Sequence, residues 1–190
     1  PGFTRGQNLE KIGQHAGDTS ELFFNDLRVP ADALLGGVEG QGFVQMMREL
    51  PRERLIIGVQ AVYGAKGALD ATVKYVQERQ AFGQAIGQFQ NTRFTLAQCA
   101  SDIAAAEAFL NASVAAYERG ELTPEAASAL KLHTTEVMGR VADACLQLFG
   151  GYGYMAEYPI SRFWTDARVL RIYGGTSEIM KELVARSLLG

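Results

Sequence analysis

The sequence is poor in the residues from which metal sites and catalytic triads are built. Its 190 residues include two histidines, His15 and His133, and two cysteines, Cys99 and Cys145. These four residues lack the spacing of a metal-ligand cluster, and two histidines are a thin supply for a Ser-His-Asp triad. We therefore expect no metal site, and we expect the cysteines to be buried thiols of the kind found in reducing compartments.

Charge of one sign and long apolar runs are also scarce. The 18 basic and 21 acidic residues leave a formal net charge of −3, which gives no basic footprint for nucleic acid. The best apolar run, residues 55–65, is short and contains Gln60, so we expect no transmembrane span. The chain begins with neither an initiator methionine nor a signal peptide, which indicates a piece of a longer protein.

What the sequence does have is a change of pattern near residue 38. Residues 1–38 carry short apolar pieces, then Val29-Pro30 and a double glycine, which predicts strands and a linker. A segment this short cannot close a sheet alone, so we expect residues 1–38 to be the end of a truncated β-domain. We expect residues 39–190 to form a helical domain.

The remainder has the apolar periodicity of long helices. Pro51 suits the first turn or a kink of the first helix, Gly83 lies beyond its expected end, and Gly120 beyond that of the second. The third helix is expected to begin with Thr123 as N-cap and to end at Gly150. Each of the long helices, and the last helix, has an expected core stripe. These stripes are, in the first helix, Leu55, Val59, Val62, Leu69, Val73 and Val76; in the second, Leu96, Ala100, Ile103, Leu110, Val114 and Tyr117; in the third, Leu130, Val137, Val141, Cys145 and Leu148; and in the last helix, which follows a shorter one around 160–170, Ile179, Leu183, Val184 and Leu188. Short connections between such helices predict a mainly α fold, an up-and-down four-helix bundle.

The stretch GYGYMA, residues 151–156, loosely matches the glycine spacing of a dinucleotide-binding loop. It follows a helix pattern and precedes Pro159, whereas that loop needs a strand before it and a helix after it. We therefore reject a dinucleotide-binding fold and interpret the glycines as helix termination and tight packing.

Glu53 stands between two arginines in the stretch RELPRERLI, where the long helix begins. Its face runs into the apolar Ile56 and Ile57, so the carboxylate could be desolvated, with the raised pKa of a general base. The alternative is an acid that is favoured by the helix dipole and paired with Arg52 or Arg54. Composition alone favours this alternative.

Arg79 and Phe82 lie at the expected end of the long helix, ahead of a polar loop that ends in Gln90. Arg79 could bind a phosphate with two hydrogen bonds while Phe82 packs against an aromatic ring. Arg79 could equally cap helix carbonyls in water, which is the commoner case.

The double glycine of RIYGGTSEIM, residues 171–180, is a further candidate. Its backbone N–H groups, together with the dipole of the last helix, can face an anion or a carbonyl oxygen. Thr176 is expected as the N-cap of that helix and Glu178 as an acid of its first turn. The alternative is an ordinary helix start.

Together these pieces resemble the acyl-CoA dehydrogenase family, and are most like its long-chain type. The motifs that carry the resemblance are ERLIIG (53–58), RQAFGQAIGQFQ (79–90), QLFGGYGYMAEYPISRFWTDAR (147–168) and IYGGTSEIMKELVAR (172–186). Residues 9–36 look like the last strands of the family's middle β-domain. The resemblance covers essentially the whole chain and matches it to the C-terminal half of a subunit.

The resemblance implies FAD-dependent α,β-dehydrogenation of an acyl-CoA thioester in fatty-acid β-oxidation, with electrons passed to electron-transfer flavoprotein. It also implies a homo-oligomer, usually a dimer of dimers, in the cytoplasm of a bacterium or the mitochondrial matrix of a eukaryote. The alternatives are a branched-chain, isovaleryl-like dehydrogenase and a flavin oxidase or monooxygenase. The chain alone is expected to be inactive, to bind FAD weakly or not at all, and to act as a helical oligomerisation domain.

Site residues follow from the motif positions that match. The implied FAD contacts, several of them to the cofactor of a neighbouring subunit, are Arg79 at the pyrophosphate, Phe82, Gln90, Gln147, Gly150, Gly151, Thr176 and Glu178. The implied substrate contacts are Arg54, Tyr173, Gly174 and Gly175, with the N–H of Gly174 helping to hold the thioester carbonyl.

The catalytic base is the position at which family members differ. Many relatives carry it as the glutamate of a Y-E-G-T motif, at the position of Gly174, which has no side chain here. The long-chain and isovaleryl branch keeps a small residue there and takes its base from the start of the long helix, at the position of Glu53. The resemblance therefore reverses the interpretation from composition and implies that Glu53 is the base.

Overall fold

The computed structural model describes residues 1–190, which divide into two compact units, Pro1–Glu49 and Leu50–Gly190. The division falls inside the longest helix. Each unit is described by itself.

The first unit contains an antiparallel ribbon of two strands, β1 (Phe3–Asn8) and β2 (Ser20–Phe24), in which Phe3 pairs with Phe24. Every residue of both strands is exposed, including Leu22. A 3-10 turn, η1 (Ala31–Ala33), follows the ribbon. Because an isolated two-stranded ribbon buries no face, this segment has no core of its own.

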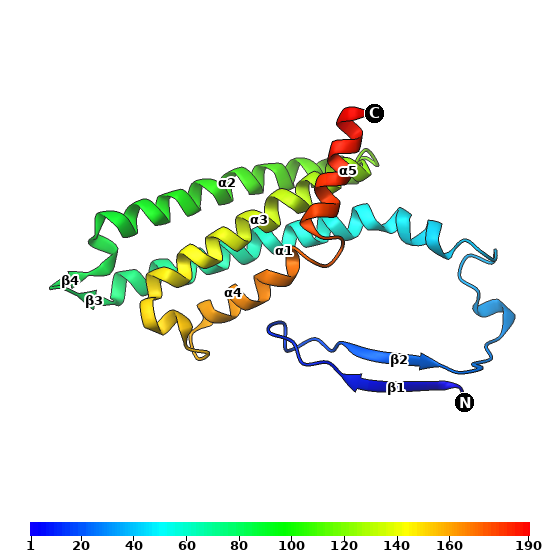
Figure 1. The fold of residues 1–190 in the computed structure, drawn as a ribbon. Helices are drawn as coiled ribbons and strands as arrows, with labels where there is room; N and C mark the ends of the chain where they lie inside the picture. The colour runs from blue at the N-terminus through cyan, green and yellow to red at the C-terminus, as the bar shows by residue number, and fades with distance from the viewer. The chain divides into compact units, whose positions relative to one another are not determined.

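Helices make up the second unit (Figure 1). They are α1 (Gly42–Glu78, which begins in the first unit), α2 (Gln90–Glu118), α3 (Pro124–Phe149), α4 (Pro159–Leu170) and α5 (Ser177–Leu189), with the 3-10 turns η2 (Ile86–Gln88) and η3 (Gly150–Tyr154). Helices α1, α2 and α3 run alongside one another, and α4 lies along α3 (Figure 1). Buried side chains of α1 to α4 form one cluster, which confirms the expected four-helix bundle. Helix α5 packs against α3.

Most helix ends follow the signals in the sequence. The Thr123 hydroxyl accepts a hydrogen bond from the Ala126 N–H at 3.2 Å, and Pro124 is the first residue of α3. Gly120 and Gly150 follow α2 and α3 with φ values of 72° and 58°, as expected of glycines that end helices. Pro51, however, lies inside α1 rather than in its first turn, because α1 begins at Gly42.

The core is built from smaller side chains than the expected stripes. In α1, Ala61 and Ala68 are completely buried, whereas Val59 of the expected stripe is exposed. A Cβ added to Gly58 would lie 3.1 Å from Leu130 Cδ2, so α1 and α3 approach each other closely at this glycine. Alanine and glycine contribute little to an apolar pattern. The sequence therefore predicted fewer buried residues on this face of α1 than the structure has.

In the other expected core stripes, four residues that were expected to be buried are exposed, so their prediction is wrong. The exposed ones are Ala100, Tyr117, Ile179 and Leu188. Cys99 and Met180, each next to one of these positions, are buried instead. Adjacent residues lie about 100° apart around a helix, and helices α2 and α5 carry apolar side chains on more than one face. Periodicity therefore does not choose the buried face in these two helices.

The segment after α1 is a hairpin where a polar loop was expected. Strands β3 (Gln80–Ala81) and β4 (Gln84–Ala85) pair antiparallel around a two-residue turn. Phe82 and Gly83 in this turn have φ values of 50° and 83°, and two positive values in succession are typical of a type I′ hairpin turn. The turn leaves the Phe82 side chain 96% exposed.

Three further findings bear on function. No helix combines the length and apolar character that crossing a bilayer requires. No group of three or more His, Cys, Asp or Glu residues is placed to hold a metal ion. Cys99 and Cys145 are free and buried.

Candidate functional site

The turn between α4 and α5 requires its two glycines. Gly174 and Gly175 have φ values of 65° and 104°, a region in which L side chains are strained. A Cβ on Gly174 would lie 2.5 Å from Ile57 Cδ1, and one on Gly175 would lie 2.6 Å from Met180 Cε. A side chain at position 174 therefore requires both a strained backbone and a displaced Ile57.

Two buried cations hold the carbonyl groups of this turn. Arg54 Nε of α1 donates to the Gly174 oxygen at 3.3 Å, and its Nη1 donates to Ser128 Oγ at 3.1 Å. Lys131 Nζ of α3 donates to the Gly175 oxygen at 2.6 Å. Arg54 is 5% exposed and Lys131 is 0% exposed. Consecutive carbonyls are thus bound from two different helices.

The electrostatics of the turn follow from this burial. Burial lowers the pKa of Arg54, and the neighbouring Glu53 carboxylate opposes the shift. Burial, helped by the positive charge of Arg54, lowers the pKa of Lys131 to about 8, against the opposing charges of Glu136 and Glu178. The turn therefore has positive charge behind its carbonyls.

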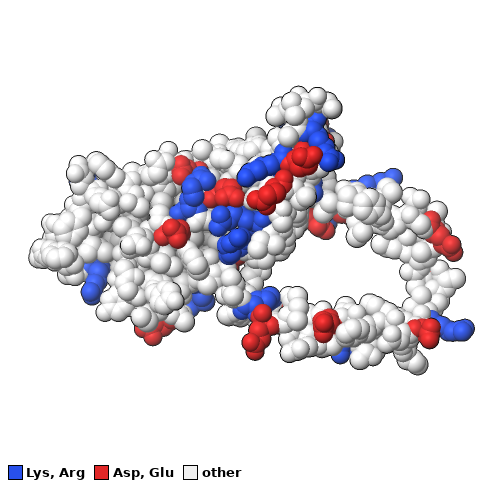
Figure 2. Space-filling model, in the orientation of Figure 1, with Lys and Arg blue, Asp and Glu red and all other residues white.

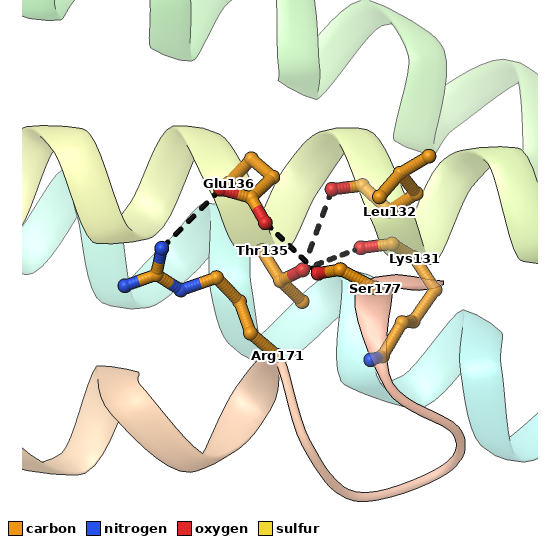
Figure 3. Close-up of polar contacts among 6 residues, drawn as sticks. All are labelled: Lys131, Leu132, Thr135, Glu136, Arg171 and Ser177. Atoms are coloured by element: carbon orange, nitrogen blue, oxygen red, sulfur yellow. Dashed lines mark hydrogen bonds and ion pairs between the residues drawn. The ribbon is translucent and has the colours of Figure 1, made fainter. Parts of the chain in front are cut away.

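The Glu136 carboxylate on α3 accepts hydrogen bonds from Arg171 and Ser177, which stand before and after the double glycine (Figure 3). Glu136 Oε1 accepts from Ser177 Oγ at 2.8 Å, and Glu136 Oε2 accepts from Arg171 Nη1 at 3.3 Å. The Ser177 N–H donates to the Arg171 carbonyl at 3.1 Å, which closes the loop between the two residues. The Tyr173 hydroxyl donates to Gln60 Oε1 at 2.7 Å.

Thr176 and Glu178 start α5 as expected. The Thr176 hydroxyl accepts from the Ile179 N–H at 3.4 Å, and Thr176 is the N-cap of the helix. Glu178 is exposed in the first turn, and hydrogen bonds from its own N–H and from the Thr176 hydroxyl lower its pKa. An exposed acid at a helix start has a favourable place beside the helix dipole.

Glu53 lies on the face of α1 that meets the turn. Residues four apart in a helix share a face, and Ile57, four residues after Glu53, lies against Gly174. Glu53 itself is exposed, so of the two alternatives that the sequence left for it, the desolvated carboxylate is not found. The reason is that Ile57 and Arg54, not Glu53, fill the contact between α1 and the turn.

A second candidate site is a hollow of about 780 Å³ at the end of the bundle that carries the β3–β4 hairpin. Five of the expected cofactor residues line it, namely Arg79, Phe82, Gln147, Gly150 and Gly151. Aromatic rings form much of the rest: the Arg79 guanidinium lies 5.1 Å from the centre of the Tyr152 ring, and Tyr75 stacks on Phe149 at 3.9 Å. On the face shown in Figure 2 this end is almost free of charged side chains, which gather instead where α5 meets α3 and α4.

The chain therefore brings the expected residues together in two groups. Arg54, Tyr173, Gly174 and Gly175 form the turn site, with Glu53 beside it on α1 and with Thr176 and Glu178 following it. The hollow is separate, because the hairpin and α5 lie at opposite ends of the bundle (Figure 1). Gln90, the first residue of α2, does not line the hollow and is exposed.

Sequence reasoning missed the polar residues that support the turn. They are Ser128, Lys131, Glu136, Arg171 and Ser177. One signal was available for Lys131: it stands with Ala127, Thr134 and Met138 at steps of four, three and four residues, and all four are buried. A lysine inside such a stripe is unusual, because lysine is almost never fully buried unless it is paired.

The fold and sequence of the bundle are of a known class. The family described as "Acyl-CoA dehydrogenase, C-terminal domain" matches residues 40–189. The chain is 46% identical over 188 residues to the long-chain specific acyl-CoA dehydrogenase of Sus scrofa mitochondria, covering 99% of this chain and 44% of that protein. The crystal structure of acyl-CoA dehydrogenase from Geobacillus kaustophilus superposes with a TM-score of 0.96 at 44% identity, over 100% of this chain and 50% of that one. A glutaryl-CoA dehydrogenase of Mycobacterium smegmatis, solved in complex with FADH2, has a TM-score of 0.94 at 28% identity, over 100% of this chain and 49% of its own.

The chain therefore belongs to the acyl-CoA dehydrogenase family. It spans about half the length of the relatives it matches.

Proposed function

We propose that this chain is the C-terminal part of an FAD-dependent acyl-CoA dehydrogenase that acts on long-chain acyl-CoA, with Glu53 as the catalytic base and electron-transfer flavoprotein as the electron acceptor. The observation that carries the proposal is the contact of Ile57 with Gly174. It fills the space of a side chain at position 174, where many relatives have their base, and Glu53 shares the face of Ile57 one turn away.

The turn would supply the electrostatic part of the reaction. As the α-proton leaves, negative charge develops on the thioester carbonyl oxygen, and the Gly174 N–H stabilises it there. Arg54 and Lys131 add positive charge behind the same turn. Glu53 takes the proton, because its carboxylate is exposed at the edge of this site and free to approach an acyl chain.

The hollow fits one end of FAD in size and chemistry. Its volume of about 780 Å³ is within the range of cofactor pockets. Arg79 can bind a pyrophosphate with two parallel hydrogen bonds, and the rings of Phe82 and Tyr152 offer flat apolar surface. Gln147 and the backbone of Gly150 and Gly151 would contact the adenine end. When bound, FAD supplies the redox chemistry by accepting the β-hydrogen as hydride.

The separation of the two groups of residues supports a homo-oligomer. Arg79 belongs to the hollow, whereas Thr176 and Glu178 lie at the start of α5, at the other end of the bundle (Figure 1). If both groups contact FAD, each flavin is shared between two copies of the protein. Such sharing requires at least a dimer, and from the resemblance to the family we propose a dimer of dimers for the full-length enzyme.

The test of the base is the substitution Glu53→Gln in the full-length, flavin-loaded protein. We expect FAD to stay bound, because Glu53 is not among the expected cofactor contacts. Bleaching of the flavin by a saturated acyl-CoA should slow by on the order of 10²–10⁴-fold, the usual cost of losing a general base. The measurement is stopped-flow absorbance of the oxidised flavin band, with a panel of straight and branched acyl chains.

Asp70→Asn is the matched control, since Asp70 is an exposed acid farther along the same helix. Its bleaching rate should equal that of the parent. A Glu53→Gln variant that bleaches at the parent rate would refute the assignment of the base. Peroxide release without electron-transfer flavoprotein would favour the oxidase alternative, and fastest bleaching by a branched chain would favour the isovaleryl-like alternative.

A further inference from the structure

Lys131 is a charged side chain with no contact to solvent. Its residue is 0% exposed, and it is among the largest side chains that the fold buries completely. Burying an ammonium group is costly unless hydrogen bonds or opposite charges compensate, and lysine is almost never fully buried without them. Methionine has a similar length and no charge, and would fill the same space in α3 more cheaply. Packing alone therefore does not explain a lysine here.

The ammonium group is directed at a backbone carbonyl rather than at a carboxylate. Lys131 Nζ lies 2.6 Å from the oxygen of Gly175. Glu136, five residues farther along the same helix, is already bonded to Arg171 and Ser177 (Figure 3). The positive charge of Lys131 is thus available to the turn.

The turn needs such contacts because two adjacent glycines are the least restrained pair of residues in a chain. Arg54 holds the peptide plane that follows Gly174, and Lys131 holds the plane that follows Gly175. On the other side, the Tyr173 N–H donates to the Val169 carbonyl at 3.1 Å. Gly174 is therefore restrained from both directions. Since the N–H of a trans peptide points opposite to its C=O, the inward Gly174 and Gly175 carbonyls direct the N–H groups of Gly175 and Thr176 away from α1 and α3. The Gly174 N–H lies in the preceding peptide plane, and its direction depends on the backbone conformation of Gly174 that these contacts restrain.

We propose that Lys131 is a positioning residue for the acyl-CoA reaction, which restrains the Gly174–Gly175 turn so that the Gly174 N–H stays directed at the thioester carbonyl of the substrate. The proposal rests on the proposed function of the turn. Lys131 touches neither substrate nor flavin in this scheme. It acts through the conformation of Gly175.

The pH dependence of turnover should report this role. Burial and the charge of Arg54 on α1 lower the pKa of Lys131 to about 8, while Glu136 on α3 and Glu178 on α5 oppose them. Ser128 of α3, bonded to Arg54, is neutral. A hydrogen bond from a charged donor is roughly twice as strong as one from a neutral donor, so the hold on Gly175 weakens as Lys131 loses its proton. The kcat of the parent enzyme should fall as the pH rises through about 8.

The test compares Lys131→Met with the parent in the full-length, flavin-loaded enzyme. The first readout is the absorption band of a bound arylacryloyl-CoA, a conjugated thioester that is not dehydrogenated further. Its band moves to the red when hydrogen bonds polarise the carbonyl. We expect Lys131→Met to lose most of this red shift and to lower kcat by on the order of 10–10²-fold, with KM changed much less, because misplacement of a catalytic group costs about this much. The fall of kcat above pH 8 should disappear.

Two further variants separate positioning from simple stability. Lys131→Gln keeps a donor without the charge, and should retain part of the red shift while losing the alkaline fall in kcat. Lys66→Met is the matched control, since Lys66 pairs with Glu107 at 2.7 Å on the other side of α1 and is partly exposed. It should leave the red shift and kcat at the parent values.

The inference is overturned if Lys131→Met, with full flavin content, keeps the red shift and kcat of the parent. If Lys131→Met does not retain flavin, Lys131→Gln decides: a Gln variant that keeps the alkaline fall in kcat overturns the inference as well. A parent enzyme that no acyl-CoA bleaches would refute the proposed function itself. That outcome is distinct from a bleaching enzyme in which Lys131 makes no difference.

Discussion

Ile57 and the backbone of Gly174 both oppose a base at position 174. Ile57 Cδ1 lies 2.5 Å from the point where Gly174 would carry a Cβ, and the φ of 65° at Gly174 disfavours any side chain there. We expect Glu53→Gln combined with Gly174→Glu to remain inactive, although it restores the carboxylate at the position used by many relatives. Adding Ile57→Ala should recover part of the lost rate, since it opens the space for the new side chain.

The measurement is the rate of flavin bleaching in the full-length protein by an acyl-CoA to which the parent responds. Glu53→Gln alone should lose on the order of 10²–10⁴-fold, and the triple variant should lie between it and the parent. Ile57→Ala in the parent background is the control, because it removes a contact without moving the base. A double variant as fast as the parent would show that Ile57 is no obstacle.

The residues of the turn differ in how far the sequence predicts them. Thr176 could be predicted as an N-cap, because capping depends on residues within one turn of each other. The contacts of Arg54 with Gly174 and of Lys131 with Gly175 join residues far apart in the chain. No local pattern encodes such contacts. The sequence left the burial of Glu53 open between two alternatives, since it depends on which neighbours of α1 fill the space around the turn.

The start of α3 shows how much one helix cap contributes at the scale of an element. The Thr123 hydroxyl accepts from the Ala126 N–H, which otherwise has no partner within the helix. We expect Thr123→Ala to lower the free energy of unfolding by about 1 kcal/mol. Thr95→Ala is the control, because Thr95 lies inside α2 with its hydroxyl bonded to the Asn91 carbonyl at 2.9 Å. Alanine has the higher helix propensity, so this change should be neutral or stabilising by about 0.5 kcal/mol.

Chemical denaturation of both variants and the parent, followed by circular dichroism, measures the two effects. Opposite signs for the same Thr→Ala exchange would separate the cap from the loss of a methyl and a hydroxyl. Equal effects of the two exchanges would mean that the Thr123 hydrogen bond adds nothing to the stability of α3.

The ends of the helices were predictable because proline, glycine and threonine act on their immediate neighbours in the sequence. For the same reason, the Thr123→Ala exchange affects one helix end without changing distant contacts. The β3–β4 hairpin was not predicted, because its turn is Phe82-Gly83 and phenylalanine rarely adopts a positive φ. The buried face of α1 was also understated, since Ala61 and Ala68 carry less hydrophobic signal than Val59. Close packing of α1 on α3 at Gly58 selects small residues that a search for large apolar ones overlooks.

At the scale of the whole molecule, the two candidate sites lie at opposite ends of the bundle (Figure 1). The hollow is formed by the chain itself, from α1, the hairpin, η2, α2, α3 and η3. We expect the residues at the start of α5 to contact the FAD that is held in the hollow of another copy. We therefore expect the 190-residue chain alone to bind FAD weakly or not at all, and to be colourless as purified.

Fluorescence titration of FAD, with the full-length protein beside the 190-residue chain, measures this difference. Weak binding by the chain should depend on the hollow, so Arg79→Met should abolish it, whereas Lys66→Met should not. The Arg79 guanidinium is held over the Tyr152 ring before any ligand arrives, and a pre-positioned cation is what a pyrophosphate requires. Stoichiometric yellow flavin on the purified chain would contradict the expectation. It would mean that one copy of the hollow supplies nearly all of the binding free energy, and that the contacts at the start of α5 add little to it.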